Sequence, residues 1–150
     1  MRQPLDVLVG RLIHHCGALE LLVNNSLIQL SYDRILAAEA TKAPLVRRIV
    51  SLRRLLHDRT DVPDDAIETL CDSLDAIRKK RNMVAHNPIV SAERDPDVPE
   101  TILVVRYGSE GATKTHEMHR EEVADLVTES NVLLRRFIEL FPPAATDGKH

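Results

Sequence analysis

An arginine, an asparagine and a histidine lie close together near the middle of the chain. Arg81 and Asn82 are neighbours, and His86 follows Asn82 by four residues. In a helix, a spacing of four puts Asn82 and His86 on one face, one turn apart. The guanidinium of arginine presents a planar fork of N–H donors that suits phosphate oxygens, and an imidazole exchanges protons near neutral pH. Together these side chains could stabilise an oxyanion and transfer a proton.

Charged residues around this segment fall into blocks of one sign. Residues 42–59 carry six basic side chains against one acidic one, residues 61–75 carry six acidic side chains, and residues 78–81 are all basic. Two interpretations stay open: the blocks are solvated helix faces that pair with one another, or two basic segments converge on a phosphate-bearing ligand. The net charge of −3 argues against a surface that is basic all round.

Apolar periodicity predicts the helix that positions these residues. Its buried face should consist of residues at helical spacing, namely Ile67, Leu70, Cys71, Leu74 and Ile77. The pattern continues to His86, and Pro88 then ends the helix. Arg81 follows Ile77 by four and so lies about 40° from the apolar stripe. The motif therefore lies beside the stripe, which predicts a site at a helix–helix or subunit interface.

The other helices are predicted from the same periodicity. One covers residues 4–30, and a second helical region covers residues 33–57, where Pro44 should split it in two. Residues 58–63 are predicted to be a turn. The last helix covers residues 120–141 and ends at the two prolines that follow.

A β-hairpin is predicted before the last helix. Residues 101–107 are β-branched or aromatic at most positions, residues 108–111 have the composition of a turn, and residues 112–118 return as a second strand. The expected fold is mainly α, a bundle of four to five helices with one inserted hairpin. We expect one domain over residues 1–141 and a disordered tail over residues 142–150.

Composition narrows the class of protein. The two cysteines, Cys16 and Cys71, are too few and too far apart to suggest a disulfide framework, so a cytoplasmic protein is expected. No segment approaches the roughly 18 uninterrupted apolar residues of a membrane span, and Asp6 and Arg11 interrupt any export signal. The scattered glycines form no phosphate-binding loop, and the histidines lack zinc-ligand spacing. We therefore expect no cofactor, no metal and no membrane partner.

The segment Arg81-Asn82-Met83-Val84-Ala85-His86 resembles the R-N-x-x-x-H motif of HEPN domains, in which an arginine and a polar residue precede a histidine. The setting is similar too, because the motif closes a helix, a proline follows it and long helices flank it. The segment Gly17-Ala18-Leu19-Glu20 also looks like many family members. The resemblance covers most of the chain in layout, while its motif is short.

This resemblance implies a metal-independent endoribonuclease of the toxin or defence type. His86 would exchange protons with the ribose oxygens, Arg81 would stabilise the pentavalent phosphorane, and Asn82 would orient the phosphate or His86. The products would carry 2′,3′-cyclic phosphate and 5′-hydroxyl ends. Since one motif supplies one histidine, and family members commonly dimerise, the resemblance also implies a composite site in a homodimer.

Further partners follow from the same resemblance. The substrate would be RNA, guided by a set of basic residues, namely Arg47, Arg48, Arg53, Arg54, Arg78, Lys79 and Lys80. Glu20 is expected to reach Arg81 and hold it, and an antitoxin protein is a further expected partner. Two alternatives stay open: a non-catalytic HEPN-like domain that binds a nucleotide, RNA or a protein, and a bundle in which Arg81 and His86 only tie helices together.

Overall fold

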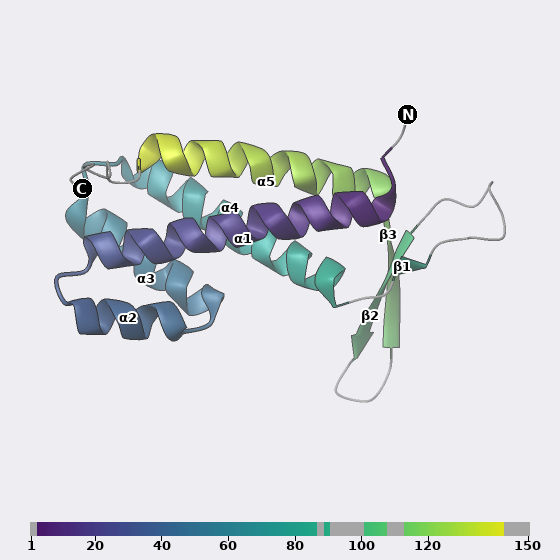
Figure 1. Cartoon of the computed structure of the whole chain (residues 1–150), viewed down its shortest axis with the longest axis horizontal. Coiled ribbons are helices and arrows are strands. Elements are labelled where there is room, and N and C mark those ends of the chain that lie inside the picture. The colour runs from purple at the N-terminus through teal and green to yellow at the C-terminus, as the bar shows by residue number, and fades with distance from the viewer. Residues whose placement is uncertain (1–2, 87–88, 91–100, 108–112, 143–150) are drawn as a thin grey trace, which may run out of the picture. The chain divides into compact units, whose positions relative to one another are not determined.

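The computed structural model of the chain describes residues 3–86, 89–90, 101–107 and 113–142. This part of the chain is mainly helical (Figure 1). Its helices are α1 (Leu5–Leu30), α2 (Arg34–Lys42), α3 (Leu45–Arg59), α4 (Asp64–Ala85) and α5 (Arg120–Leu140). Its strands are β1 (Ile89–Val90), β2 (Thr101–Tyr107) and β3 (Thr113–His119). The prediction of a mainly helical chain is confirmed.

Local sequence signals account for the helix ends. Pro44 stands before the first residue of α3 in an extended conformation, with φ −54° and ψ 145°, and it separates α3 from α2 as predicted. Asp33 caps α2, because its Oδ1 accepts hydrogen bonds from the backbone N–H of Ile35 at 2.7 Å and of Leu36 at 3.4 Å. The predicted turn at residues 58–63 begins later than expected, since α3 continues to its last residue, Arg59.

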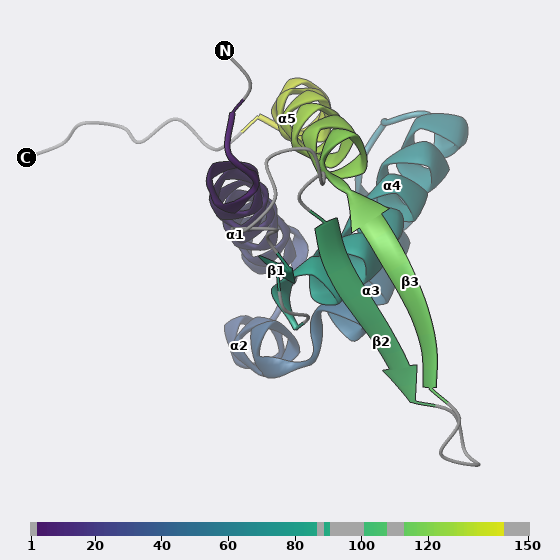
Figure 2. The same ribbon diagram turned by 90° about the vertical axis from the view of Figure 1, so that its right-hand side faces the viewer.

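The strands form one antiparallel sheet in the order β1–β2–β3. The strands β2 and β3 pair along their whole length, from Thr101 opposite His119 to Tyr107 opposite Thr113, which confirms the predicted pairing (Figure 2). The two-residue strand β1 was not predicted, since it is too short to show a period of two. The predicted turn at residues 108–111, the loop at 91–100 and most of the predicted tail lie outside the described residues.

The chain divides into two compact units. The first contains residues 1–16 and 77–131, and the second contains residues 17–76 and 132–150. Helices α1, α4 and α5 contribute residues to both units. The candidate catalytic residues belong to the first unit, and the basic residues of α3 belong to the second. The prediction of one domain over residues 1–141 stays a prediction.

Each unit buries an aliphatic core. In the first unit the buried side chains include Leu5, Leu8, Leu12, Ile77, Val84, Val123 and Leu126. In the second they include Leu19, Val23, Leu27, Leu52, Leu56, Leu70, Cys71 and Phe137. All five residues predicted for the buried face of α4 are at most 5% exposed. The burial of this face decides which way the rest of α4 points, including the residues of the motif.

Candidate active site at the end of helix α4

The candidate residues lie in the last turn of α4 and just after it. Helix α4 ends at Ala85, and His86 follows it in a turn. The backbone N–H of His86 donates a hydrogen bond to the carbonyl oxygen of Asn82 at 3.2 Å. This bond spans four residues, as inside a helix, so His86 stands one turn beyond Asn82. Val84, in the last turn of the helix, is buried with 3% of its surface exposed. The predicted row of Asn82 and His86 on one helix face is consistent with this geometry.

Arg81 and Asn82 are joined to each other. The Nη1 of Arg81 donates a hydrogen bond to the Oδ1 of Asn82 at 3.0 Å, and both side chains are half-buried. A guanidinium can only donate, so the amide oxygen must face it. Apart from this amide oxygen, the polar groups of both side chains are N–H donors. Such a pair suits an anion and does not suit a cation.

His86 has an exposed side chain. Within the described residues, no other side chain forms a hydrogen bond or an ion pair with its imidazole. The side chain is therefore exposed to solvent, as a group that transfers protons to a ligand must be. The alternative in which His86 ties helices together stays a prediction.

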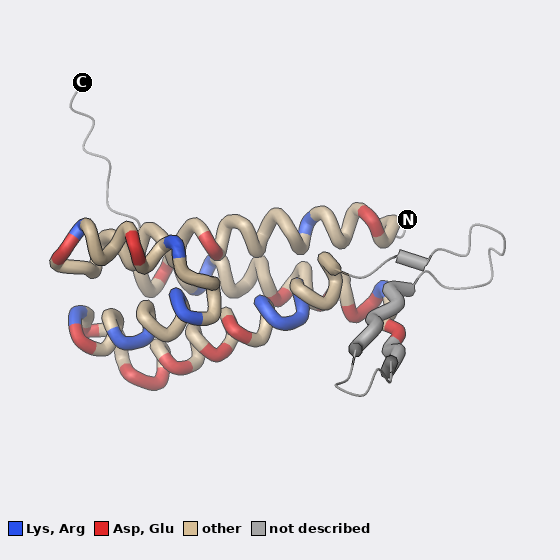
Figure 3. The backbone as a smooth tube through the Cα atoms, turned by 90° about the horizontal axis from the view of Figure 1, so that it is seen from below, with Lys and Arg blue, Asp and Glu red and all other residues tan. Residues whose placement is uncertain are grey.

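Four consecutive basic residues precede the motif residue Asn82. Arg78 and Arg81 are half-buried, whereas Lys79 and Lys80 are exposed. They form a continuous basic stretch on α4 (Figure 3). The carboxyl end of a helix carries the negative end of its dipole, which disfavours an anion. Any phosphate bound here must therefore be held by these side-chain charges and not by the helix itself.

The predicted RNA-binding residues of α3 differ in their availability. Arg48 has a side chain that is 12% exposed, donates to the Oδ1 of Asn24 at 2.8 Å and lies 3.5 Å from a carboxylate oxygen of Glu20. By contrast, Arg47 and Arg54 are exposed, and neither forms an ion pair with any residue that the structure describes. Arg47 and Arg54 could meet RNA directly, whereas Arg48 would first have to leave its pair. The role of Glu20 beside Arg81 stays a prediction.

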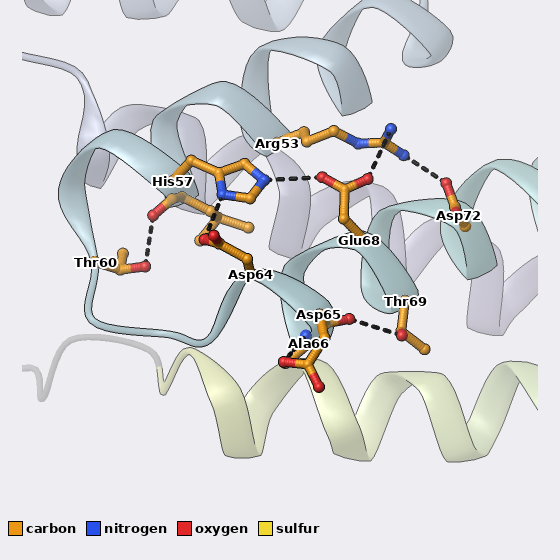
Figure 4. Close-up of polar contacts among 10 residues, drawn as sticks. Arg53, His57, Thr60, Asp64, Asp65, Ala66, Glu68, Thr69 and Asp72 are labelled. Atoms are coloured by element: carbon orange, nitrogen blue, oxygen red, sulfur yellow. Dashed lines mark hydrogen bonds and ion pairs between the residues drawn. The ribbon is translucent and has the colours of Figure 1, made fainter.

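A network of charges joins the end of α3 to the start of α4. Arg53 lies 3.1 Å from the Oε2 of Glu68 and 2.6 Å from the Oδ1 of Asp72 (Figure 4). The ring of His57 contacts both Asp64 and Glu68, at 2.9 and 2.8 Å. We call these five residues the α3–α4 charge network. Here the charge blocks of the sequence do pair with one another, so Arg53 is engaged in the same way as Arg48.

The contacts of His57 have a consequence for its protonation. A neutral imidazole carries one N–H, yet both ring nitrogens face carboxylate oxygens. Only the protonated ring donates to both, and the hydrogen bonds to Glu68 and to Asp64 accordingly raise the pKa of His57 above its ordinary value. In the sequence, the signal for this network was the spacing of four within each helix, from Arg53 to His57 and from Asp64 to Glu68.

A serine–histidine pair lies in the first unit. The Nδ1 of His15 is 2.9 Å from the Oγ of Ser130, and this Oγ donates to the carbonyl oxygen of Val127 at 2.9 Å. Because the serine proton is engaged, Nδ1 must be the donor in the first bond. Ser130 is fully buried, so this pair holds α1 against α5 and does not form a nucleophile. Sequence reasoning missed it, since 115 residues separate the two.

The described residues contain no cluster of three or more histidine, cysteine or acidic side chains arranged to hold a metal ion. Cys71 is buried, and this burial raises the pKa of its thiol, so it is a poor nucleophile. None of the helices in the described part of the chain has both the length and the apolar content of a membrane span. Comparisons of the chain with protein-family models, with curated proteins and with solved structures find no match.

Proposed function

We propose that the chain is a metal-independent endoribonuclease of the HEPN type, whose site consists of Arg81, Asn82 and His86. One observation carries the proposal: an exposed imidazole stands one turn beyond a hydrogen-bonded arginine–asparagine pair, whose guanidinium is a positively charged donor. An anion binder and a proton-transfer group at this spacing are what cleavage of a phosphodiester by a neighbouring hydroxyl requires.

The proposed reaction uses the 2′-hydroxyl of the RNA as the nucleophile. His86 removes the proton of this hydroxyl, and the 2′-oxygen forms a bond to phosphorus. Arg81 stabilises the charge of the resulting phosphorane, and the amide N–H groups of Asn82 help to orient it. The bond from phosphorus to the 5′-oxygen then breaks, and a second acid protonates the leaving oxygen. The products are a 2′,3′-cyclic phosphate and a 5′-hydroxyl.

The second acid is proposed to be His86 of a second copy of the chain. The base and the acid act on opposite sides of an in-line displacement, and the motif supplies one histidine per chain. A homodimer with a composite site therefore completes the reaction. The proposal extends to a cytoplasmic, toxin-like or defence-like role held in check by an antitoxin protein, in keeping with the two free thiols of Cys16 and Cys71.

The experiment is an RNA cleavage assay in EDTA. We expect the parent chain to cleave RNA, His86→Ala to lose about 10²–10⁴-fold in rate, and Arg81→Ala to lose about 10²–10³-fold. Analysis of the product ends should find cyclic phosphates. Cleavage that survives both substitutions would show that the site lies elsewhere, and loss of cleavage in EDTA that is restored by a divalent cation would rule out the metal-independent mechanism.

A binding role without cleavage is the second candidate, and the exposed Lys79 and Lys80 favour it. These two cations can contact phosphates whether or not His86 acts as an acid or a base. A chain that binds RNA with a strong dependence on salt, and leaves it intact under every condition tested, would support binding over catalysis.

A further inference from the structure

Tyr32 is an aromatic side chain that the fold leaves almost entirely in solvent. It is 89% exposed, more than any other large apolar side chain that the structure describes, and it lies in the short link from α1 to α2 (Figure 1). The chain has two tyrosines, two phenylalanines and no tryptophan. Since aromatic rings are among the side chains that gain most from burial, a ring left in solvent is available to a ligand.

The backbone on each side of Tyr32 is held in place. The Oγ of Ser31 donates a hydrogen bond to the carbonyl oxygen of Leu27 at 2.6 Å, which ties this neighbour to the end of α1. Asp33 caps α2 through its side chain, which ties the other neighbour to the next helix. The link is therefore ordered before any ligand arrives, and binding to the ring costs less conformational entropy.

A guanidinium lies over this ring. Arg59, in the last turn of α3, places its Cζ 2.9 Å from the centroid of the Tyr32 ring, where the negative face of the ring attracts a cation. Both residues belong to the second compact unit. Within the described residues Arg59 forms no hydrogen bond and no ion pair. The N–H groups at the edge of its guanidinium are therefore available to an acceptor such as a phosphate oxygen.

The charges near the ring are of both signs. Arg34 is exposed and, like Arg59, forms no ion pair with any residue that the structure describes. The exposed acidic residues nearby in the sequence are Asp33, Asp58 and Asp61. Such a mixture does not suit a duplex, whose binding depends on many phosphates. It suits a single nucleotide, which needs a flat surface for its base and a cation for its phosphate.

We propose that Tyr32 and Arg59, called here the Tyr32–Arg59 site, bind an unpaired base of single-stranded RNA. The base stacks on the face of the ring that Arg59 does not cover, and the guanidinium donates to a phosphate of the same strand. Stacking accepts every base, because each has a π face. The choice of RNA as the ligand rests on the proposed function, and the site adds a contact in the second unit to the catalytic residues of the first.

The fluorescence of Tyr32 tests the stacking directly. The chain has no tryptophan and two tyrosines, so in Tyr107→Phe the emission comes from Tyr32 alone. A 2′-O-methyl oligouridylate, which has unpaired bases and lacks the 2′-hydroxyl nucleophile, should quench this emission, and the same strand annealed to its complement should not. Tyr32→Phe, whose emission comes from Tyr107, corrects for absorption by the RNA. Absence of quenching, or equal quenching by the duplex, would overturn the proposal.

Affinity for the same oligonucleotide, labelled and measured by fluorescence anisotropy, gives a second readout. We expect Tyr32→Ala to bind about 5- to 150-fold more weakly and Tyr32→Phe, which keeps the ring, to stay within about twofold of the parent. Leu36→Ala is the matched control, because it removes another largely exposed side chain from the same part of the chain. Unchanged binding by Tyr32→Ala, or equal weakening by Leu36→Ala, would overturn the proposal. Circular dichroism checks that each variant is folded.

Two further outcomes separate this site from its alternatives. A free mononucleotide offers the same base and phosphate, and tighter binding of uridine monophosphate than of the oligonucleotide would overturn the assignment to RNA. The site and the catalysis also fail separately. Quenching of Tyr32 by the uncleavable RNA in a chain that cleaves no RNA excludes catalysis and supports the site, whereas cleavage without any quenching excludes the site alone.

Discussion

The two ends of helix α4 are both rich in charge and differ in how their charges are arranged. At the start, Asp64, Glu68 and Asp72 face basic side chains of α3, at distances of 2.6–3.1 Å. At the end, residues 78–81 carry one sign of charge, and the exposed His86 follows them. Opposite charges on facing helices hold a structure together. A run of one sign beside an accessible imidazole is better suited to a ligand with phosphate groups.

The two histidines near these ends make the comparison specific. His57 contacts two carboxylates through both of its ring nitrogens, so its proton is held in place. The ring of His86 is exposed and has no side-chain partner within the described residues. A histidine that is fully engaged contributes to stability, and one that is accessible is available for catalysis.

The largest expected effect is on catalysis by His86. Replacing His86 by alanine should lower the rate of RNA cleavage by about 10²–10⁴-fold, because the proton-transfer group is lost. The free energy of unfolding should change by less than about 0.5 kcal/mol, since the side chain is exposed. Urea unfolding monitored by circular dichroism measures the second quantity. A variant that is inactive because it is unfolded would break the comparison.

Glu68 should show the opposite pattern, because it contacts both Arg53 and His57. Its side chain is 45% exposed, so solvent screening limits the loss of stability in Glu68→Gln to about 1 kcal/mol or less. Cleavage of RNA should stay within about twofold of the parent. Glu39→Gln, which removes the exposed pair with Lys42, is the control and should change stability less.

The pH dependence of stability should reveal the His57 contacts. The pKa of His57 is raised in the folded chain, so its contribution is complete below its ordinary value of 6.5 and is lost as the pH rises through the higher folded value. The parent should therefore be more stable than His57→Gln near pH 6, and the difference should shrink at alkaline pH. A difference that grows with pH would have the wrong sign.

The smallest expected effect concerns Lys80. Replacing Lys80 by alanine should weaken RNA binding about equally for all RNA sequences. It should also reduce the slope of log affinity against log salt concentration by about one. Fluorescence anisotropy at several salt concentrations measures both. Lys42→Ala is the matched control, because Lys42 is also exposed but is paired with Glu39. Equal effects of the two substitutions would mean that RNA follows no defined path along α4.

Periodicity predicted the elements well because each is decided by its own residues. The stripe that ends at Ile77 defines the buried side of α4, and Pro44 separates α2 from α3 as expected. Contacts between distant residues could not be found in this way. The pairing of Arg48 with Glu20, 28 residues away, depends on the packing of α3 against α1, which no local pattern reveals.

The candidate site was predictable in its residues and not in its surroundings. The spacing from Asn82 to His86 implied a shared face, and the structure adds the hydrogen bond from Arg81 to Asn82. Charge counts alone could not separate Arg48 and Arg53, which are held in ion pairs, from the exposed arginines of the same helix. That distinction requires the positions of the acidic partners on other helices.

The most direct test compares His86→Ala with His57→Ala, purified in parallel, by their rates of RNA cleavage in EDTA. Both substitutions remove one imidazole from the same chain, so nonspecific effects of preparation are matched. We expect His57→Ala to cleave RNA within about twofold of the parent and His86→Ala to be slower by about 10²-fold or more. Equal rates for the two variants would contradict the proposal that the end of α4 is the catalytic site.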